Sequence, residues 1–129
     1  MSALAVLLIA KIGVTLVAVG IPMLVFPKQR IEALSGWSAT TGTVYRLYGM
    51  AVIALLVGYS GGLYEVLVLD RVPWTVLAMG FVSNAGASAV LVVTGEAAQR
   101  KMSTVFFGAI AAGLALALML PDRSMVALW

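Results

Sequence analysis

The sequence contains neither cysteine nor histidine. Without cysteine the chain has no disulfides, thiol nucleophiles, iron–sulfur ligands or thiolate zinc sites. Without histidine it lacks the usual haem ligand, the commonest general base and most transition-metal sites. The centres of its long apolar stretches also lack aspartate and glutamate, so they hold no carboxylate for proton-coupled export or for hydrolysis inside a membrane. These absences predict a protein that is not an enzyme and that uses no metal or cofactor.

Charge is scarce as well. Charged residues make up 10% of the chain and hydrophobic residues 63%, whereas a soluble domain carries about 25% charged residues. A chain with a mean hydropathy of +1.10 cannot cover a surface that faces water. The net charge is only +3, and the charged residues lie near the ends of the apolar stretches. This placement is typical of signals that orient a membrane protein and not of a nucleic-acid binding site. We therefore expect one integral membrane domain over residues 1–129.

Four stretches are apolar enough to cross the hydrocarbon layer as helices, which takes about 20 residues each. They are residues 3–26, 44–60, 73–94 and 103–120. No cationic segment precedes the first stretch, and its apolar pattern continues past Lys11, so we expect a retained helix and not a cleaved signal. The fold class predicted is therefore an all-α, four-helix transmembrane bundle.

Proline and glycine mark the ends of these stretches. The positions read as helix starts or stops are Pro27, Gly61, Gly62, Pro73, Gly95 and Pro121. Pro22 is different because it lies inside the first stretch, where it predicts a bend unless that turn is already distorted.

Two of the links between spans each have two interpretations. In the first link, Ile31, Leu34 and Trp37 fall near one face of a short helix, which suits an interfacial helix in the headgroup layer; an ordinary polar connector is the alternative. The second link contains the apolar run LYEVLVL, residues 63–69. It is either an extension of the second span or a re-entrant turn.

Lysine and arginine set the orientation in the membrane. The first link has Lys28 and Arg30, with Arg46 just inside the second span, and the third link has Arg100 and Lys101. The second link and the C-terminal tail have one arginine each. We therefore expect the first and third links on the cytoplasmic side, and both termini facing outward.

Lys11 interrupts the first span roughly 12 Å below its outer end, at a rise of about 1.5 Å per residue. A charge near the middle of a span costs about 2.5–3.5 kcal/mol, so something should compensate it. Lys11 either snorkels to a local anion or a lipid phosphate, contacts a carboxylate of a partner protein, or serves transport or catalysis. The acidic groups expected on its side of the membrane are Glu65, Asp70, Asp122 and the C-terminal carboxylate.

Arg46 lies in VYRLYGM, residues 44–50, at the opposite end of the spans. Arginine beside tyrosines is typical of an anchor at the membrane interface. The alternative is a clamp for a lipid headgroup or another anionic ligand. Lys11 and Arg46 are expected to lie too far apart to share one site.

Asn84 is the deepest uncharged polar group, and it lies among small residues in the third span. Gly80, Asn84 and Ser88 are four residues apart and therefore share one face, with Ser83 beside them. Gly113 repeats the small-residue pattern in the fourth span. Such faces allow close packing of helices, with an amide bonding across the interface; a path for a polar ligand or ion is the alternative.

Three segments carry a resemblance to a known group. They are GIPMLVFPKQRIEALSGW, YRLYGMAVIALLVGY and GFVSNAGASAVLVVTG, which together cover about half of the chain. The chain resembles the small four-helix bacterial inner-membrane proteins of the DoxX-like and uncharacterised kind. The resemblance implies a helical bundle in a bacterial inner membrane, and it implies no activity or functional residue.

These patterns predict a non-enzymatic accessory or structural subunit that packs in a homo-oligomer or a larger membrane complex. Its expected partners are membrane lipids and membrane proteins, with no nucleic acid. The alternative is a small oligomeric transporter or channel in which Ser83, Asn84 and Ser88 line a path. The two differ in what the loss of Lys11 would change, which is association in the first case and flux in the second.

Overall fold

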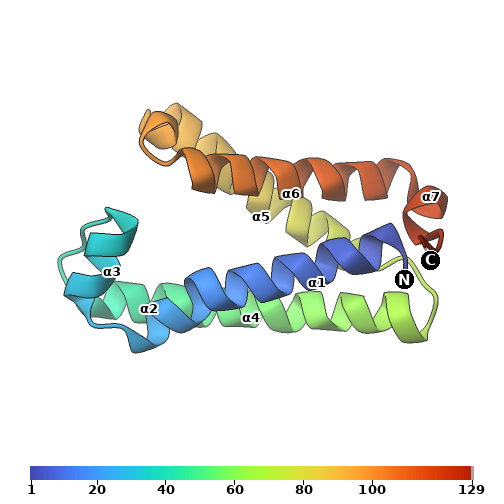
Figure 1. Cartoon of the computed structure of the whole chain (residues 1–129), viewed down its shortest axis with the longest axis horizontal. Coiled ribbons are helices and arrows are strands. Elements are labelled where there is room, and N and C mark those ends of the chain that lie inside the picture. Colours follow the sequence, from blue (N-terminus) through green and yellow to red (C-terminus); the bar gives the residue numbers. More distant parts are fainter. Residues whose placement is uncertain (129) are drawn as a thin grey trace. The chain divides into compact units, whose positions relative to one another are not determined.

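The structure is a computed structural model that describes residues 1–128 (Figure 1). Within this part of the chain it is all-α and has no strand; the one β-type feature is an isolated antiparallel bridge between Ser2 and Ala127. The elements are α1 (Ala3–Thr15), the π-helix η1 (Leu16–Gly20), α2 (Ile21–Val25), α3 (Lys28–Ser35), α4 (Gly42–Val68), α5 (Trp74–Val93), the 3-10 helix η2 (Glu96–Ala98), α6 (Lys101–Met119) and α7 (Pro121–Met125).

The described residues contain four helical segments that are long and apolar enough to cross a membrane. They are Ala3–Val25, Gly42–Val68, Trp74–Val93 and Lys101–Met119. This confirms the all-α class and the four predicted stretches. The observed ends differ from the predicted ones by a few residues, except that the second stretch continues to Val68 and not to residue 60. Four such helices suggest a multi-pass membrane protein.

The chain divides into two compact units. One is residues 10–60, and the other combines Met1–Ile9 with the chain from Gly61 onward. The divisions fall inside α1 and α4, so each of these helices contributes to both units.

In the unit of residues 10–60, the π-helix η1 lies just before the proline of the first span. The Ile21 N–H donates to the Leu16 carbonyl, five residues back. Pro22 has no N–H, and its ring would crowd the carbonyl four residues earlier in an α-helix. A π-turn at this point relieves that conflict because it widens the helix. The turn around Pro22 is therefore already distorted, which is the exception that the sequence-based prediction allowed.

Two glycines let the first span approach α4 in this unit. A Cβ on Gly20 would stand 3.0 Å from Ile53 Cδ1, and one on Gly49 would stand 3.0 Å from Leu24 Cδ2 and from Met23 Cβ. These distances are shorter than the roughly 3.5–4.0 Å of optimal carbon contacts. Glycine at these positions therefore allows backbones to meet where a larger residue would hold them apart.

The short helix α3 is attached to this unit through its inner face. Ile31, at 3% exposed, packs with Met23 and Tyr45 in a buried cluster. The helix begins after Pro27 and ends at Gly36, which adopts a left-handed conformation with φ 68°. The Gly36 N–H then donates to the Glu32 carbonyl at 2.8 Å. The first link therefore contains a helix, as one of its two interpretations required.

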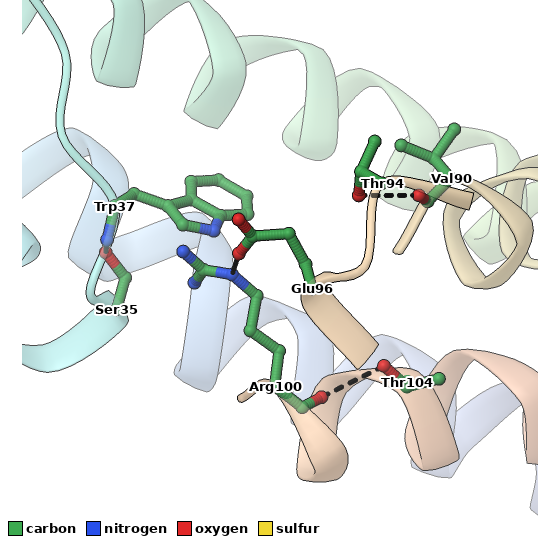
Figure 2. Close-up of polar contacts among 7 residues, drawn as sticks. All are labelled: Ser35, Trp37, Val90, Thr94, Glu96, Arg100 and Thr104. Atoms are coloured by element: carbon green, nitrogen blue, oxygen red, sulfur yellow. Dashed lines mark hydrogen bonds and ion pairs between the residues drawn. The ribbon is translucent and has the colours of Figure 1, made fainter. Parts of the chain in front are cut away.

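In the other unit, α5 and α6 lie side by side (Figure 1). The helix α5 ends at Val93, and Gly95, two residues later, has a φ of 75°, which confirms the predicted stop. The following turn holds the ion pair between Arg100 Nε and Glu96 Oε2 at 2.7 Å (Figure 2). Figure 2 also shows the Thr104 hydroxyl donating to the Arg100 carbonyl, which ties the start of α6 to this turn.

The predicted helix stop at Gly61 and Gly62 is wrong. α4 runs through both glycines to Val68, so the apolar run LYEVLVL extends the second span and is not a re-entrant turn. A Cβ on Gly62 would stand 2.8 Å from Val76 Cγ1 on α5. Gly62 therefore permits close packing between helices, and glycine serves here as a contact residue.

α4 ends at Val68, and Asp70, two residues later, closes this end. Its φ is 47°, and Asp70 is the only residue other than glycine with a positive φ among residues 1–128. The Arg71 N–H donates back to the Glu65 carbonyl at 3.0 Å. This hydrogen bond joins residues six apart, one more than in a Schellman motif, and it closes the helix end over a left-handed residue, which aspartate tolerates better than most.

The two ends of the described chain lie next to each other (Figure 1). The Leu128 N–H donates to the Met1 carbonyl at 2.9 Å, and Ser2 forms the isolated bridge with Ala127. An even number of crossings would bring both termini to the same side of a membrane, so this pairing is compatible with four crossings.

Candidate functional site

Lys11 lies in the interior of the unit of residues 10–60. Its exposed fraction is 5%, and its ammonium nitrogen stands 5.9 Å from the centre of the Tyr59 ring, which belongs to α4. A cation over an aromatic face is stabilised by up to about 2 kcal/mol when water is excluded. Tyr59 is itself only 1% exposed. The aromatic ring therefore offsets part of the cost of placing a charge within the span.

Thr15 follows Lys11 by one helical turn and shares its face of the first span. It is 9% exposed, and its hydroxyl oxygen is buried with no hydrogen-bond partner in the described residues. A buried hydroxyl without a partner costs about 1–3 kcal/mol. We call Lys11, Thr15 and Tyr59 the α1 polar cluster. Thr15 and Tyr59 were not among the predicted site residues, although the spacing of four residues from Lys11 was a usable signal for Thr15.

The burial of Lys11 bears on its three predicted roles. A side chain that is 5% exposed presents little surface to a lipid phosphate or to the carboxylate of a partner. The three roles stay predictions, and the burial adds that an anion or a partner would have to reach Lys11 within the protein.

Arg46 closes the end of the first span. Its guanidinium donates to the Met23 carbonyl and to the Phe26 carbonyl, each at 2.8 Å. The last carbonyls of a helix have no partner within the helix, and a cation there also interacts favourably with the helix dipole. Arg46 therefore joins α4 to the end of α2. The Met23 carbonyl lies about 18 Å along the span from Lys11, at about 1.5 Å per residue, and the Phe26 carbonyl lies farther. Lys11 and Arg46 therefore belong to different sites.

Glu32 organises the connection from α3 to α4. Its Oε1 accepts the Ala39 N–H at 3.0 Å and the Tyr45 hydroxyl at 3.1 Å, and Lys28 Nζ lies 3.6 Å away. The Ala39 N–H is the main reason why the pKa of the Glu32 carboxyl lies below its ordinary value. This network was not predicted from the sequence, because Glu32 is separated in the chain from Ala39 and Tyr45.

The outer side of α3 combines a cation with apolar groups. The Arg30 guanidinium carbon stands 4.3 Å from the centre of the Phe26 ring, and Leu34, one turn after Arg30, is 70% exposed. Trp37 packs edge-on against Tyr48, with ring centres 5.7 Å apart. The predicted common face is only partly correct, because Ile31 points inward while Leu34 is exposed.

Three predicted residues of the third span meet around one backbone carbonyl. The side-chain amide of Asn84 donates to the Gly80 carbonyl at 2.7 Å, and the Ser83 hydroxyl donates to the same carbonyl at 3.1 Å. Asn84 is 2% exposed. The structure therefore brings Gly80, Ser83 and Asn84 together in one group.

Ser88 and Gly113 serve other contacts. The Ser88 hydroxyl lies 3.5 Å from the Thr104 carbonyl of α6, so it takes part in the α5–α6 packing. A Cβ on Gly113 would stand 3.2 Å from Leu7 Cδ2 of α1. Both placements agree with the helix-packing interpretation of these residues.

Three glycines in the spanning helices face outward. Gly13, Gly61 and Gly86 are exposed, and a Cβ built on any of them would meet nothing within 4 Å. We call these three residues the outer glycines. They contrast with Gly49, Gly62 and Gly113, which lie against neighbouring helices.

Comparison of the chain with protein-family models, with curated proteins and with solved structures finds no match. The resemblance to DoxX-like proteins therefore stays a prediction that depends on the quoted segments. Within residues 1–128 there is also no group of three or more side chains of the kinds that hold a metal ion.

Proposed function

We propose that the protein is a small integral membrane protein that acts as a non-enzymatic accessory or structural subunit, in a homo-oligomer or a larger membrane complex. Its four apolar helices cross the membrane as a bundle, and both termini face outward. The first and third links then lie on the cytoplasmic side, with α3 in the headgroup layer. The resemblance to DoxX-like proteins favours a bacterial inner membrane.

The outer glycines are the observation that carries this proposal. A glycine within a helix costs about 0.5–1 kcal/mol relative to alanine. At Gly49, Gly62 and Gly113 the close approach of another helix explains why glycine is present. Among residues 1–128, nothing lies within 4 Å of a Cβ built on any of the outer glycines. Small residues in spanning helices typically mark the place where another helix approaches. A helix from a second copy or from another membrane protein supplies that contact.

Native mass spectrometry of the protein, extracted gently from its own membranes, tests the proposal. We expect a closed oligomer or a larger complex of fixed stoichiometry. Gly86→Leu should weaken the assembly by about 1–3 kcal/mol, or roughly fivefold or more, because the new side chain overfills the contact. Ala112→Leu is the control, since Ala112 is exposed on α6, which carries no outer glycine. Recovery of the wild-type chain as a monomer with lipid alone would overturn the proposal.

The α1 polar cluster favours a second candidate, a small oligomeric transporter or channel. Ionisable side chains within a span often belong to a substrate or ion path, and Lys11 is buried beside a hydroxyl that has no partner in the described residues. Lys11→Met separates the candidates. Weaker association would favour the subunit, whereas normal assembly with altered flux in proteoliposomes would favour conduction.

A further inference from the structure

We propose that the outer side of α3 is a docking surface for the headgroups of anionic phospholipids, with Arg30 as the residue that meets the lipid phosphate. The docking surface consists of Phe26, Arg30, Leu34 and Trp37. The inference rests on the proposed insertion of the four helices in a membrane, and it adds a lipid class and a binding residue to that proposal.

The first support is that α3 is fixed in place. Its inner face is held by Ile31, which is buried with Met23 and Tyr45. The Glu32 carboxylate bonds to the Ala39 N–H and to the Tyr45 hydroxyl. These two attachments fix which side of α3 faces outward, so the docking surface does not need a lipid to form.

The second support is the arrangement of Arg30. The Phe26 ring lies 4.3 Å from its guanidinium carbon, and a guanidinium held over a ring keeps the donors along its edge for hydrogen bonds. Among residues 1–128, Arg30 forms no ion pair, whereas Lys28 pairs with Glu32 at 3.6 Å. Arginine is well suited to phosphate, which it binds through two parallel hydrogen bonds.

The third support is the charge around the surface. Residues 26–48 contain Lys28, Arg30 and Arg46 against a single acidic residue, Glu32, which gives a net charge of 3 − 1 = +2. The Glu32 carboxylate is already engaged by Ala39, Tyr45 and Lys28. The surface is therefore complementary to an anion, and each cation close to an anionic leaflet strengthens binding about fivefold.

The fourth support is the apolar part of the surface. Leu34 is 70% exposed, and Trp37 and Tyr48, at 37% and 38%, form an edge-on aromatic pair. Tryptophan and tyrosine gather at the level of the headgroups in membrane proteins. A phospholipid supplies a phosphate for Arg30 and an acyl region for Leu34 and Trp37, which a soluble anion does not.

Fluorescence quenching by brominated lipids tests the inference. The chain is reduced to one tryptophan, Trp37, by Trp74→Phe and Trp129→Phe, and is placed in bilayers of zwitterionic lipid with increasing brominated anionic lipid. We expect anionic lipid to be preferred at Trp37. Arg30→Gln should reduce the preference about fivefold, Arg30→Lys should restore part of it, and Arg123→Gln, a control on α7, should leave it unchanged.

Several outcomes would overturn the inference. They are equal quenching by anionic and zwitterionic lipid, a preference that survives Arg30→Gln, and a preference that millimolar inorganic phosphate removes, which would indicate a soluble-anion site. A matched chain that retains only Trp74, at the start of α5, reports on the proposed function separately. If Trp74 is quenched and Trp37 is not, the docking surface fails alone; if neither is quenched, the proposed membrane insertion fails as well.

Discussion

Two adjacent glycines of α4 should respond in opposite directions when each is replaced by alanine. Both lie in the interior of the same helix, so both variants gain about 0.5–1 kcal/mol of helix preference. At Gly61 the added methyl meets nothing within 4 Å, whereas at Gly62 it would stand 2.8 Å from Val76 Cγ1 and 3.0 Å from Val76 Cβ. Overpacking of this kind costs about 1–3 kcal/mol.

The helix preference cancels in the difference between the two variants, which leaves the steric cost. We therefore expect Gly62→Ala to be less stable than Gly61→Ala by about 1–3 kcal/mol. Gly61→Ala should be slightly more stable than the wild type. The measurement is the free energy of unfolding by sodium dodecyl sulfate in mixed micelles, followed by circular dichroism.

A double variant identifies the contact. Val76→Ala removes the methyl groups that the new side chain would meet, so it should recover part of the stability lost in Gly62→Ala. A thermodynamic cycle over the two positions then measures their coupling. The reasoning is refuted if Gly61→Ala and Gly62→Ala change stability equally, because α4 would then not pack against α5 at Gly62.

Two further predictions concern polar groups in the unit of residues 10–60. Arg46→Met should lower the free energy of unfolding by about 2 kcal/mol, since it removes two hydrogen bonds from a charged donor to the Met23 and Phe26 carbonyls. Arg46→Lys should lower it by about half as much. An unchanged free energy of unfolding in both variants would contradict these hydrogen bonds. The lowered pKa of Glu32 means that its ionised form stabilises the fold fully above the ordinary pKa of 4.5, and that this contribution disappears as the pH falls through the lower folded value. The melting temperature should therefore fall less steeply between about pH 6 and pH 3 in Glu32→Gln, which cannot ionise, than in the wild type. An equal slope in both proteins would show that the Ala39 N–H does not control the ionisation of this carboxylate.

The spans were predictable from sequence because their signal is local. A run of about 20 apolar residues has one stable form in a bilayer, and hydropathy alone finds it. The end of α4 was not predictable in this way. Gly62 looks like a stop in the sequence, but it is a contact with Val76, and the true stop is the left-handed Asp70. Whether a glycine ends a helix or packs against a neighbour depends on the neighbour.

The polar groups also differ in whether their contacts could be predicted from local sequence. Lys11 and Thr15 lie four residues apart, so their shared face follows from helix geometry. Tyr59 joins them only because one particular face of α4 meets the first span. Glu32 reaches Ala39 and Tyr45 across a turn whose path depends on where α3 docks. Side-chain networks of this kind require the tertiary fold before they can be predicted.

Labelling of single cysteines from one side of the membrane tests the proposed membrane topology most directly. The natural chain has no cysteine, so each variant carries one thiol. The positions are Ser38, Arg71, Gln99 and Ala127, all exposed. In intact cells, a maleimide that does not cross the membrane should label Arg71→Cys and Ala127→Cys, and should leave Ser38→Cys and Gln99→Cys unlabelled until the cells are opened. Labelling of Ser38→Cys and Arg71→Cys from the same side would contradict the proposed crossings, and the reverse pattern would contradict the proposed orientation.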